Sequence, residues 1–485
     1  MKRRNIENKS RTFKQLNVSK RQVSVLFFIR AQLLNRGRTF IILAMCFLYL
    51  VQYFFPFSTL NHTLSIVGIV IFFMTIFYVG NTQKTIAIVL FLLGVVVHVS
   101  VKEQPLFSSF VYIQRNLPIL TLIILVPLIS IPIKAGGYFK SVQYFMIKTR
   151  SRPKLSFIFL SSFLGLISPI LNMGTVRIVH EMVDGLKLNP RLLANSYMTG
   201  FTSAMLWSPY FASVVIVLYE IGADIQKYVL LALPVAIVYL LVGNLLFSLK
   251  YDDKQNEYIN LPLNENGKQT ERFHLINISK LLSFLFMLIG LLLVIEAVTK
   301  LPMLLIVSLI AIFVPTIWGL STRKFGELLP AMRSYFNGIW FMKNEITLFL
   351  SAGFFASAIA KTPITEGIEY YLLTIANISI LLFALIIFFI VFILAFIGVH
   401  QIIVVPILAS QIQASVIGIT PEMLALIFIL SWSVTVIICP LSAINIIVSN
   451  CVKQNGFTVG FKWNGRFVVS IVSLVFFIVY LSQFF

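Results

Sequence analysis

Runs of about 20 apolar residues recur along the whole chain, and this feature limits the possible folds more than any other. Each run has the length of a helix that crosses a bilayer. Hydrophobic residues make up 59% of the 485 residues and charged residues only 11%. A soluble protein of this composition would lack the polar side chains to cover its surface. The sequence therefore predicts an all-α polytopic membrane protein.

The pattern predicts about 11 transmembrane helices and two longer apolar regions that are interrupted by polar residues. The expected spans are 39–58, 63–79, 85–101, 116–133, 190–222, 228–249, 276–298, 301–319, 345–360, 421–450 and 466–483. The two interrupted regions, 155–183 and 370–413, do not fit as single crossings. We expect each to form a re-entrant hairpin, which enters and leaves on one side of the membrane with its tip inside the bilayer.

The distribution of Lys and Arg predicts the orientation of the chain. The net charge is +21, and six basic residues lie within 134–154 alone. If the N-terminus is inside, the predicted outer loops hold only Lys102, Arg115, Lys227, Lys300 and Lys361. This asymmetry follows the positive-inside rule and predicts a multi-pass protein of the cell membrane with a cytoplasmic N-terminus. The rule also accounts for the basic charge, so no nucleic-acid partner is expected.

This orientation is testable in the longest polar loop, 250–275. A cysteine placed at residues 250–270 is expected to react with a maleimide only from the cytoplasmic side. Labelling of intact cells there by an impermeant maleimide would contradict the topology.

Five regions follow from this reading. Residues 1–38 form a basic cytoplasmic tail, whose apolar part either lies on the inner membrane surface or extends the first span. Residues 39–62 hold the first span. The first repeat covers 63–249 and contains the hairpin 155–183. The linker is 250–275, and the second repeat covers 276–485 and contains the hairpin 370–413.

Two proline pairs indicate an internal repeat. Pro190 and Pro421 are separated by the same interval as Pro209 and Pro440, and we call this spacing the repeat interval. In each copy the first proline is expected to open a helix and the second to break it. With five spans in each copy the two must lie in opposite orientations. An inverted repeat with broken helices is how secondary transporters build a substrate site near the bilayer midplane.

The first hairpin carries polar residues at the depth where such a site would lie. Pro169 and Gly174 are expected to end one half-helix and to begin the next. The freed N–H groups would then favour an anion. We expect a small anionic solute to be lined by polar residues of this hairpin and of the break that follows it, namely Ser168, Asn172, Thr175, Arg177 and Ser208. Arg177 has this role, or reaches the cytoplasmic interface, or pairs with Glu181 one helical turn on.

Three segments of the second half resemble a known family. They are "LFLSAGFFASAIAKTPITEGI" from Leu348, "GVHQIIVVPILASQI" from Gly398 and "CPLSAINIIVS" from Cys439. These segments resemble the ion transporter superfamily, and within it the divalent anion–sodium symporter type. The resemblance implies an elevator-like carrier, a homodimer in which a hairpin-bearing domain moves against a scaffold in the lipid bilayer. It also implies substrate-binding roles for residues of the second tip and the second break, namely Gly398, His400, Gln401, Ser442 and Asn445.

The hairpin tips differ from the family's Ser-Asn-Thr pattern, which there holds sodium and the substrate carboxylate. The tips here are "SPILNMGT" and "IGVHQ". We therefore expect transport to be proton-coupled or uncoupled. His400 either carries the proton or is a neutral side chain bonded to the backbone.

Two other classes of function remain open. One is a non-transporting membrane protein, or one that handles lipids or cell-envelope precursors, built on a transporter fold. The other is a membrane glycan polymerase, which the absence of a long predicted outer loop disfavours. No enzymatic activity, cofactor or metal is expected. The three cysteines, Cys46, Cys439 and Cys451, lack the spacing of metal ligands.

Overall fold

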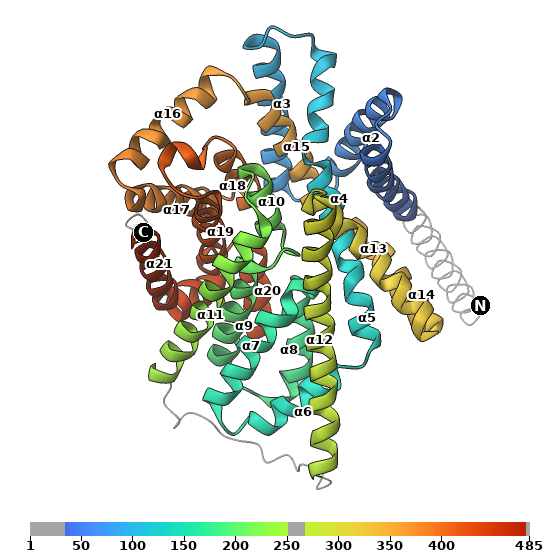
Figure 1. Cartoon of the computed structure of the whole chain (residues 1–485), viewed down its shortest axis with the longest axis vertical. Coiled ribbons are helices and arrows are strands. Elements are labelled where there is room, and N and C mark those ends of the chain that lie inside the picture. The colour runs from blue at the N-terminus through green and yellow to red at the C-terminus, as the bar shows by residue number, and fades with distance from the viewer. Residues whose placement is uncertain (1–33, 251–266, 482–485) are drawn as a thin grey trace, which may run out of the picture.

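The chain is helical, with no strand, throughout the part that the structure describes (Figure 1). The structure is a computed structural model and describes residues 34–250 and 267–481. In these ranges 11 helices are long and apolar enough to cross a membrane. The prediction of an all-α polytopic membrane protein with about 11 transmembrane helices is confirmed.

The N-terminal third consists of four spans and a short helix. Helix Leu34–Phe54 precedes α2 (Ser58–Ile76) and α3 (Asn81–Ser100). The fourth span, Leu106–Ala135, is assembled from η1 (Leu106–Asn116), α4 (Leu117–Leu125), η2 (Val126–Ile129) and α5 (Ser130–Ala135). The short helix is α6 (Phe139–Thr149).

A helical hairpin and a broken helix follow. The hairpin consists of α7 (Pro153–Leu171) and α8 (Gly174–Val183), and η3 (Asp184–Leu186) follows it. The broken helix consists of α9 (Pro190–Trp207) and α10 (Ala212–Ile221). Pro190 takes the first position of α9, while the Asn189 side chain caps that helix by accepting the N–H of Arg191 at 2.8 Å. Helix α11 (Ile225–Lys250) then leads to the linker.

The third quarter of the chain returns to the first group of helices. Long helix α12 (Gly267–Thr299) stands upright in Figure 1. The elements that follow it are α13 (Met303–Thr322), α14 (Phe325–Ile339), η5 (Trp340–Met342), α15 (Lys343–Ile359) and α16 (Pro363–Ile378). Helix α15 packs against α2, α3 and η1, so the beginning and the third quarter of the chain form one group.

The last quarter repeats the order of hairpin and broken helix. The hairpin consists of α17 (Ile380–Phe396) and α18 (Gln401–Ala409), followed by η6 (Ala414–Ile417). The broken helix consists of α19 (Pro421–Ile438) and α20 (Ala443–Val452). A π-helical turn, η7 (Thr458–Trp463), and α21 (Asn464–Leu481) complete the described chain.

The two broken helices have identical bounds at the repeat interval. Residues 190, 207, 212 and 221 bound the two halves of the first, and residues 421, 438, 443 and 452 bound those of the second. Each bound of the first helix and the corresponding bound of the second are separated by the repeat interval, as Pro190 and Pro421 are. The predicted openings at Pro190 and Pro421 and the predicted breaks at Pro209 and Pro440 therefore agree with the structure.

The two broken helices run in opposite directions. Glu422 at the start of α19 accepts the N–H of Asp224, just beyond the end of α10, at 3.2 Å. At the other end Asn195, near the start of α9, donates to the Trp463 carbonyl at 3.5 Å. The packing is reciprocal as well: the second arm of each hairpin contacts the other copy's half-helix after the break, α8 with α20 and α18 with α10.

Several predicted boundaries differ from those of the structure. Residues 370–378 belong to α16, because the Ser379 side chain caps a new helix by accepting the N–H of Leu382. Residues 267–275 belong to α12 and not to the linker. The remaining parts of the predicted tail and linker, 1–33 and 251–266, lie outside the described residues.

The 11 predicted spans and the 11 helices of membrane-spanning length in the described residues also differ by one helix. Helix α15, the predicted span 345–360, has 17 residues, whereas α7 has 19 and is long and apolar enough to cross. The hairpin α7–α8 covers the predicted range 155–183 and begins slightly earlier, at Pro153. Its re-entrant course in a membrane stays a prediction.

Candidate substrate site

The first helix break leaves carbonyl groups that side chains satisfy. Residues between Trp207 and Ala212 are not helical, so the last carbonyls of α9 lose their intrahelical partners. The Ser213 hydroxyl donates to the Met205 carbonyl at 3.4 Å, and the Tyr228 hydroxyl donates to the Leu206 carbonyl. Ser208 is fully buried, and its hydroxyl accepts the N–H of Tyr210 at 3.3 Å.

At the second break, side chains again donate hydrogen bonds to the equivalent carbonyls. Val436 and Ile437 lie one repeat interval after Met205 and Leu206. The Ser442 hydroxyl donates to the Val436 carbonyl, and the Asn445 amide donates to the Ile437 carbonyl at 2.8 Å. Both copies thus use side chains to pair the carbonyls that the proline frees.

Ser442 and Asn445 therefore have a structural task that the sequence did not reveal. Asn445 also donates to the Gly456 carbonyl at 3.2 Å and accepts the Ser449 hydroxyl at 2.9 Å. With these bonds both ends of its amide are occupied, and its side chain is fully buried. Of the two predicted site residues at this break, neither has a free donor to offer a solute.

The first hairpin turns at Asn172 and not at Pro169. Asn172 has a φ of 49° and ends α7, while Pro169 lies inside the last turn of that helix. The Asn172 side chain accepts the N–H of Met173 at 2.8 Å, and the backbone carbonyl of Asn172 accepts the Thr175 hydroxyl at 2.8 Å. Asn172 and Thr175 thus hold the turn together. Gly174 begins α8, as expected.

Ser168 is the residue of this hairpin with an unsatisfied polar atom. Its side chain is fully buried, and its Oγ has no hydrogen-bond partner among the residues that the structure describes. A buried hydroxyl without a partner is costly, so it is a natural position for a ligand contact.

The second hairpin turns at Gly398 and is capped by His400. Gly398 has a φ of 99°, which favours glycine, and a Cβ there would lie 3.5 Å from Thr82 at the start of α3. The His400 Nδ1 accepts the N–H of Ile402 at 3.2 Å and so caps α18. In this arrangement the neutral ring carries its proton on Nε2 and can donate it. The neighbouring Gln401 is 2% exposed.

Arg177 lies on the exposed side of α8. It forms no ion pair with Glu181 or any other described carboxylate. No group of three His, Cys, Asp or Glu side chains in residues 34–250 and 267–481 is arranged to hold a metal ion.

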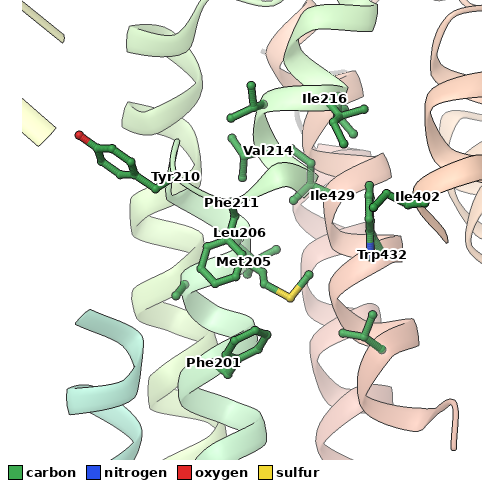
Figure 2. Packing of buried hydrophobic residues seen from close by; sticks show 14 of the residues in the cluster. Phe201, Met205, Leu206, Tyr210, Phe211, Val214, Ile216, Ile402, Ile429 and Trp432 are labelled. Atoms are coloured by element: carbon green, nitrogen blue, oxygen red, sulfur yellow. The ribbon is translucent and has the colours of Figure 1, made fainter. Parts of the chain in front are cut away.

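Buried apolar side chains cluster between the two broken helices, alongside buried hydroxyls such as those of Thr202 and Ser433. Figure 2 shows Phe201, Met205 and Phe211 from the α9–α10 side, with Ile402 and Trp432 on the α18–α19 side. All five are buried. The sequence analysis did not predict this apolar cluster. The nearly continuous apolar composition of 421–438 is nevertheless typical of a helix that is buried on every side.

The sequence matches no protein-family model and no curated protein. Among solved structures, the chain is similar to one described as the crystal structure of the Alcanivorax borkumensis YdaH transporter, with an unusual topology. The identity is 13%, the TM-score is 0.49, and the match covers 74% of this chain and 85% of that one. A likeness of this degree assigns neither a substrate nor a mechanism. The identity of the chain as a helical membrane protein rests on the 11 long apolar helices within residues 34–250 and 267–481.

Proposed function

We propose that the chain is a secondary transporter that moves a small anionic solute across the cell membrane, with its N-terminus in the cytoplasm. One observation carries the proposal: two antiparallel broken helices with identical bounds at one offset, each preceded by a hairpin that packs on the other copy. Inverted repeats with discontinuous helices are the means by which many transporters form a site that opens to either side.

We propose that residues at the two hairpin tips contribute to the solute site. Ser168 offers a buried hydroxyl without a partner in the described residues, and His400 offers its Nε2–H. Gln401 opens α18, where the first N–H groups of a helix favour an anion. Apolar side chains such as Met205 and Trp432 lie between the two broken helices, so they favour a solute that joins an apolar body to its anionic group.

An elevator-type motion fits the division of the molecule into two groups. The hairpins and broken helices, α7–α11 and α17–α21, would move against the group that contains α2, α3, α12–α15 and η1. This second group would be the scaffold that the family resemblance implies, and the homodimer that the resemblance also implies is part of the proposal. At the linker end of the molecule, Lys148 on α6 forms an ion pair with Glu271 on α12, with 2.6 Å between Nζ and Oε1.

The geometry of His400 gives the proposed proton coupling a specific form. The second ring proton would have to sit on Nδ1, which now accepts the Ile402 N–H. Protonation therefore requires the cap of α18 to open. A bound anion close to the ring would favour the charged imidazole and so link the opening of the cap to the presence of solute.

His400→Asn is the sharpest test of this function. Asparagine is a good helix cap, so the fold of α18 is retained, whereas the Nε2–H and the titration are lost. In proteoliposomes loaded from a panel of organic anions, we expect the wild-type chain to transport at least one, with a response to an imposed pH gradient. The variant should lose most of the transport and all of the pH response at an unchanged melting temperature.

The matched control is Ser410→Ala in the turn after α18, because the Ser410 hydroxyl bonds only within that turn: it donates to the Ile407 carbonyl at 3.0 Å and accepts from the Gln411 amide at 2.8 Å. It should transport as the wild type does. Normal, pH-responsive transport by His400→Asn would refute the role of this histidine. Failure of the wild-type chain to transport any anion would contradict the function itself.

The cluster of apolar side chains between the broken helices favours a second candidate function, the handling of a lipid-like cell-envelope precursor. Such a substrate would be an amphiphile whose chain lies among residues like Phe201 and Trp432. A scrambling assay with labelled lipid-linked precursors in the same proteoliposomes separates this candidate from transport of a soluble anion.

A further inference from the structure

A pocket lined by two arginines lies away from the hairpin tips, at the end of the molecule where the linker joins. It is formed where the start of α9, the end of α11 and the junction of η7 with α21 meet. The pocket encloses about 50 Å³, which is enough for a few water molecules or one phosphate group. Arg191 and Arg466 line it from two different helices.

The polar groups of the pocket are not used up by the fold. Neither Arg191 nor Arg466 forms an ion pair with a described carboxylate. Asn195 donates to the Trp463 carbonyl at 3.5 Å, while its Oδ1 is buried without a partner in the described residues. Arg191 and Arg466, both exposed residues without a described counter-ion, thus line the same cavity. The unpaired atom of Asn195 is an acceptor, so the phosphate bonds would come from the two arginines.

The internal repeat supplies a comparison inside the same molecule. Arg191, Asn195 and Thr199 follow one another at single-turn spacing and so share one face of α9. The residues one repeat interval later, on α19, are Glu422, Leu426 and Leu430. The equivalent face of the second copy is therefore acidic and apolar, although its helix has the same bounds. The fold does not require the polar face of α9.

Two backbone features mark the walls of the pocket. Gly243 of α11 lines it, and a Cβ there would lie 2.5 Å from Thr199 Cγ2 and 3.3 Å from Phe467. A larger residue would therefore clash with Thr199 and shift the wall that α9 and α11 share. The opposite wall is the end of the π-helical turn Thr458–Trp463, a geometry that is rare and frequently found at functional sites.

The geometry points to a binding site for a phosphate group, held by Arg191 and Arg466 and supplied by the headgroup of an anionic membrane lipid. Arginine pairs with phosphate through two parallel hydrogen bonds, which suits a pocket with two guanidinium groups. The remaining walls include Phe157 and Leu246, which offer an apolar surface to the part of a lipid below its headgroup. The site is separate from the solute site proposed above and does not depend on it.

The test measures lipid binding to the full chain in detergent. The melting temperature is followed while phosphatidylglycerol, phosphatidylcholine or inorganic phosphate is added. We expect phosphatidylglycerol to stabilise the wild type by several degrees and phosphatidylcholine to have little effect. Arg191→Gln and Arg466→Gln should each weaken the apparent affinity for phosphatidylglycerol by about fivefold, because each removes one charge near the headgroup.

The matched control is Lys462→Gln, which removes a charge from the exposed surface of the same π-helical turn without touching the pocket. It should bind phosphatidylglycerol as the wild type does. Equal weakening by Lys462→Gln would overturn the proposal, since general surface charge would then explain the binding. Stabilisation by inorganic phosphate at the same concentrations as by the lipid would keep the phosphate site but assign it to a free anion.

A second variant tests the pocket without changing its charge. Gly243→Ala adds a methyl group that displaces Thr199 in the wall of the pocket and keeps both arginines. We expect it to weaken phosphatidylglycerol binding at least as much as a single arginine variant does. Unchanged binding by Gly243→Ala, together with unchanged binding by both arginine variants, would show that the pocket holds no lipid.

Discussion

Arg115→Ala is expected to destabilise the protein by about 2–3 kcal/mol, and Glu220→Ala on the same background to recover much of that loss. The Arg115 guanidinium lies 2.9 Å from the Glu220 carboxylate, and their side chains are 25% and 7% exposed. Removal of the arginine leaves a buried carboxylate without its charged partner, which is more costly than the loss of the pair.

The measurement is a double-mutant cycle on the unfolding midpoint in a denaturing detergent titration. The control is Lys148→Ala, which breaks the ion pair with Glu271. Those side chains are 45% and 36% exposed, so we expect a change below about 1 kcal/mol. Equal losses from Arg115→Ala and Lys148→Ala would show that the Arg115–Glu220 pair is no better shielded from water than a surface pair.

The same pair bears on the proposed motion, because it joins η1 of the first group to α10 of the hairpin group. If these groups move against each other, the pair must break in every cycle. The double variant Arg115→Gln/Glu220→Gln should therefore transport faster than the wild type where this step limits the rate. An unchanged rate would mean that the contact persists through the cycle or that another step is slower.

The helix breaks could be predicted from the sequence because the chemistry of proline is local. Pro209 and Pro440 cannot donate a backbone hydrogen bond wherever they lie, and the structure breaks both helices there. Pro169 was expected to act in the same way but lies within the last turn of α7. The turn comes later, at the positive φ of Asn172, which the sequence alone does not specify.

The partners of polar side chains could not be predicted, because they depend on contacts between distant residues. Asn445 bonds to the carbonyl of Gly456 across a turn that the sequence does not describe. The start of the second hairpin was also missed, since the capping role of Ser379 inside an apolar region is a weak signal. The polar face Arg191–Asn195–Thr199 has helical spacing in the sequence, but the pocket that it lines depends on distant residues of α11 and α21.

Asn445 and Ser168 were both predicted to line the solute site, and the structure gives them opposite expected responses to alanine. Asn445→Ala leaves the carbonyls of Ile437 and Gly456 without the donor that now pairs them. Each buried, unpaired carbonyl costs about 1–3 kcal/mol, so we expect a loss of several kcal/mol and little folded protein.

Ser168→Ala removes a buried hydroxyl that has no partner in the described residues, so the fold should be as stable as the wild type or slightly more stable. If the hydroxyl contacts the solute, transport by this variant should fall by about tenfold, the effect of one lost hydrogen bond of about 1.4 kcal/mol. Thermal unfolding and proteoliposome uptake on the same preparations measure both responses. A stable Asn445→Ala variant would show that the second break does not need its side-chain partner. A fully active Ser168→Ala variant would exclude Ser168 from the solute site, because the loss of a hydrogen bond to the solute should lower the transport rate.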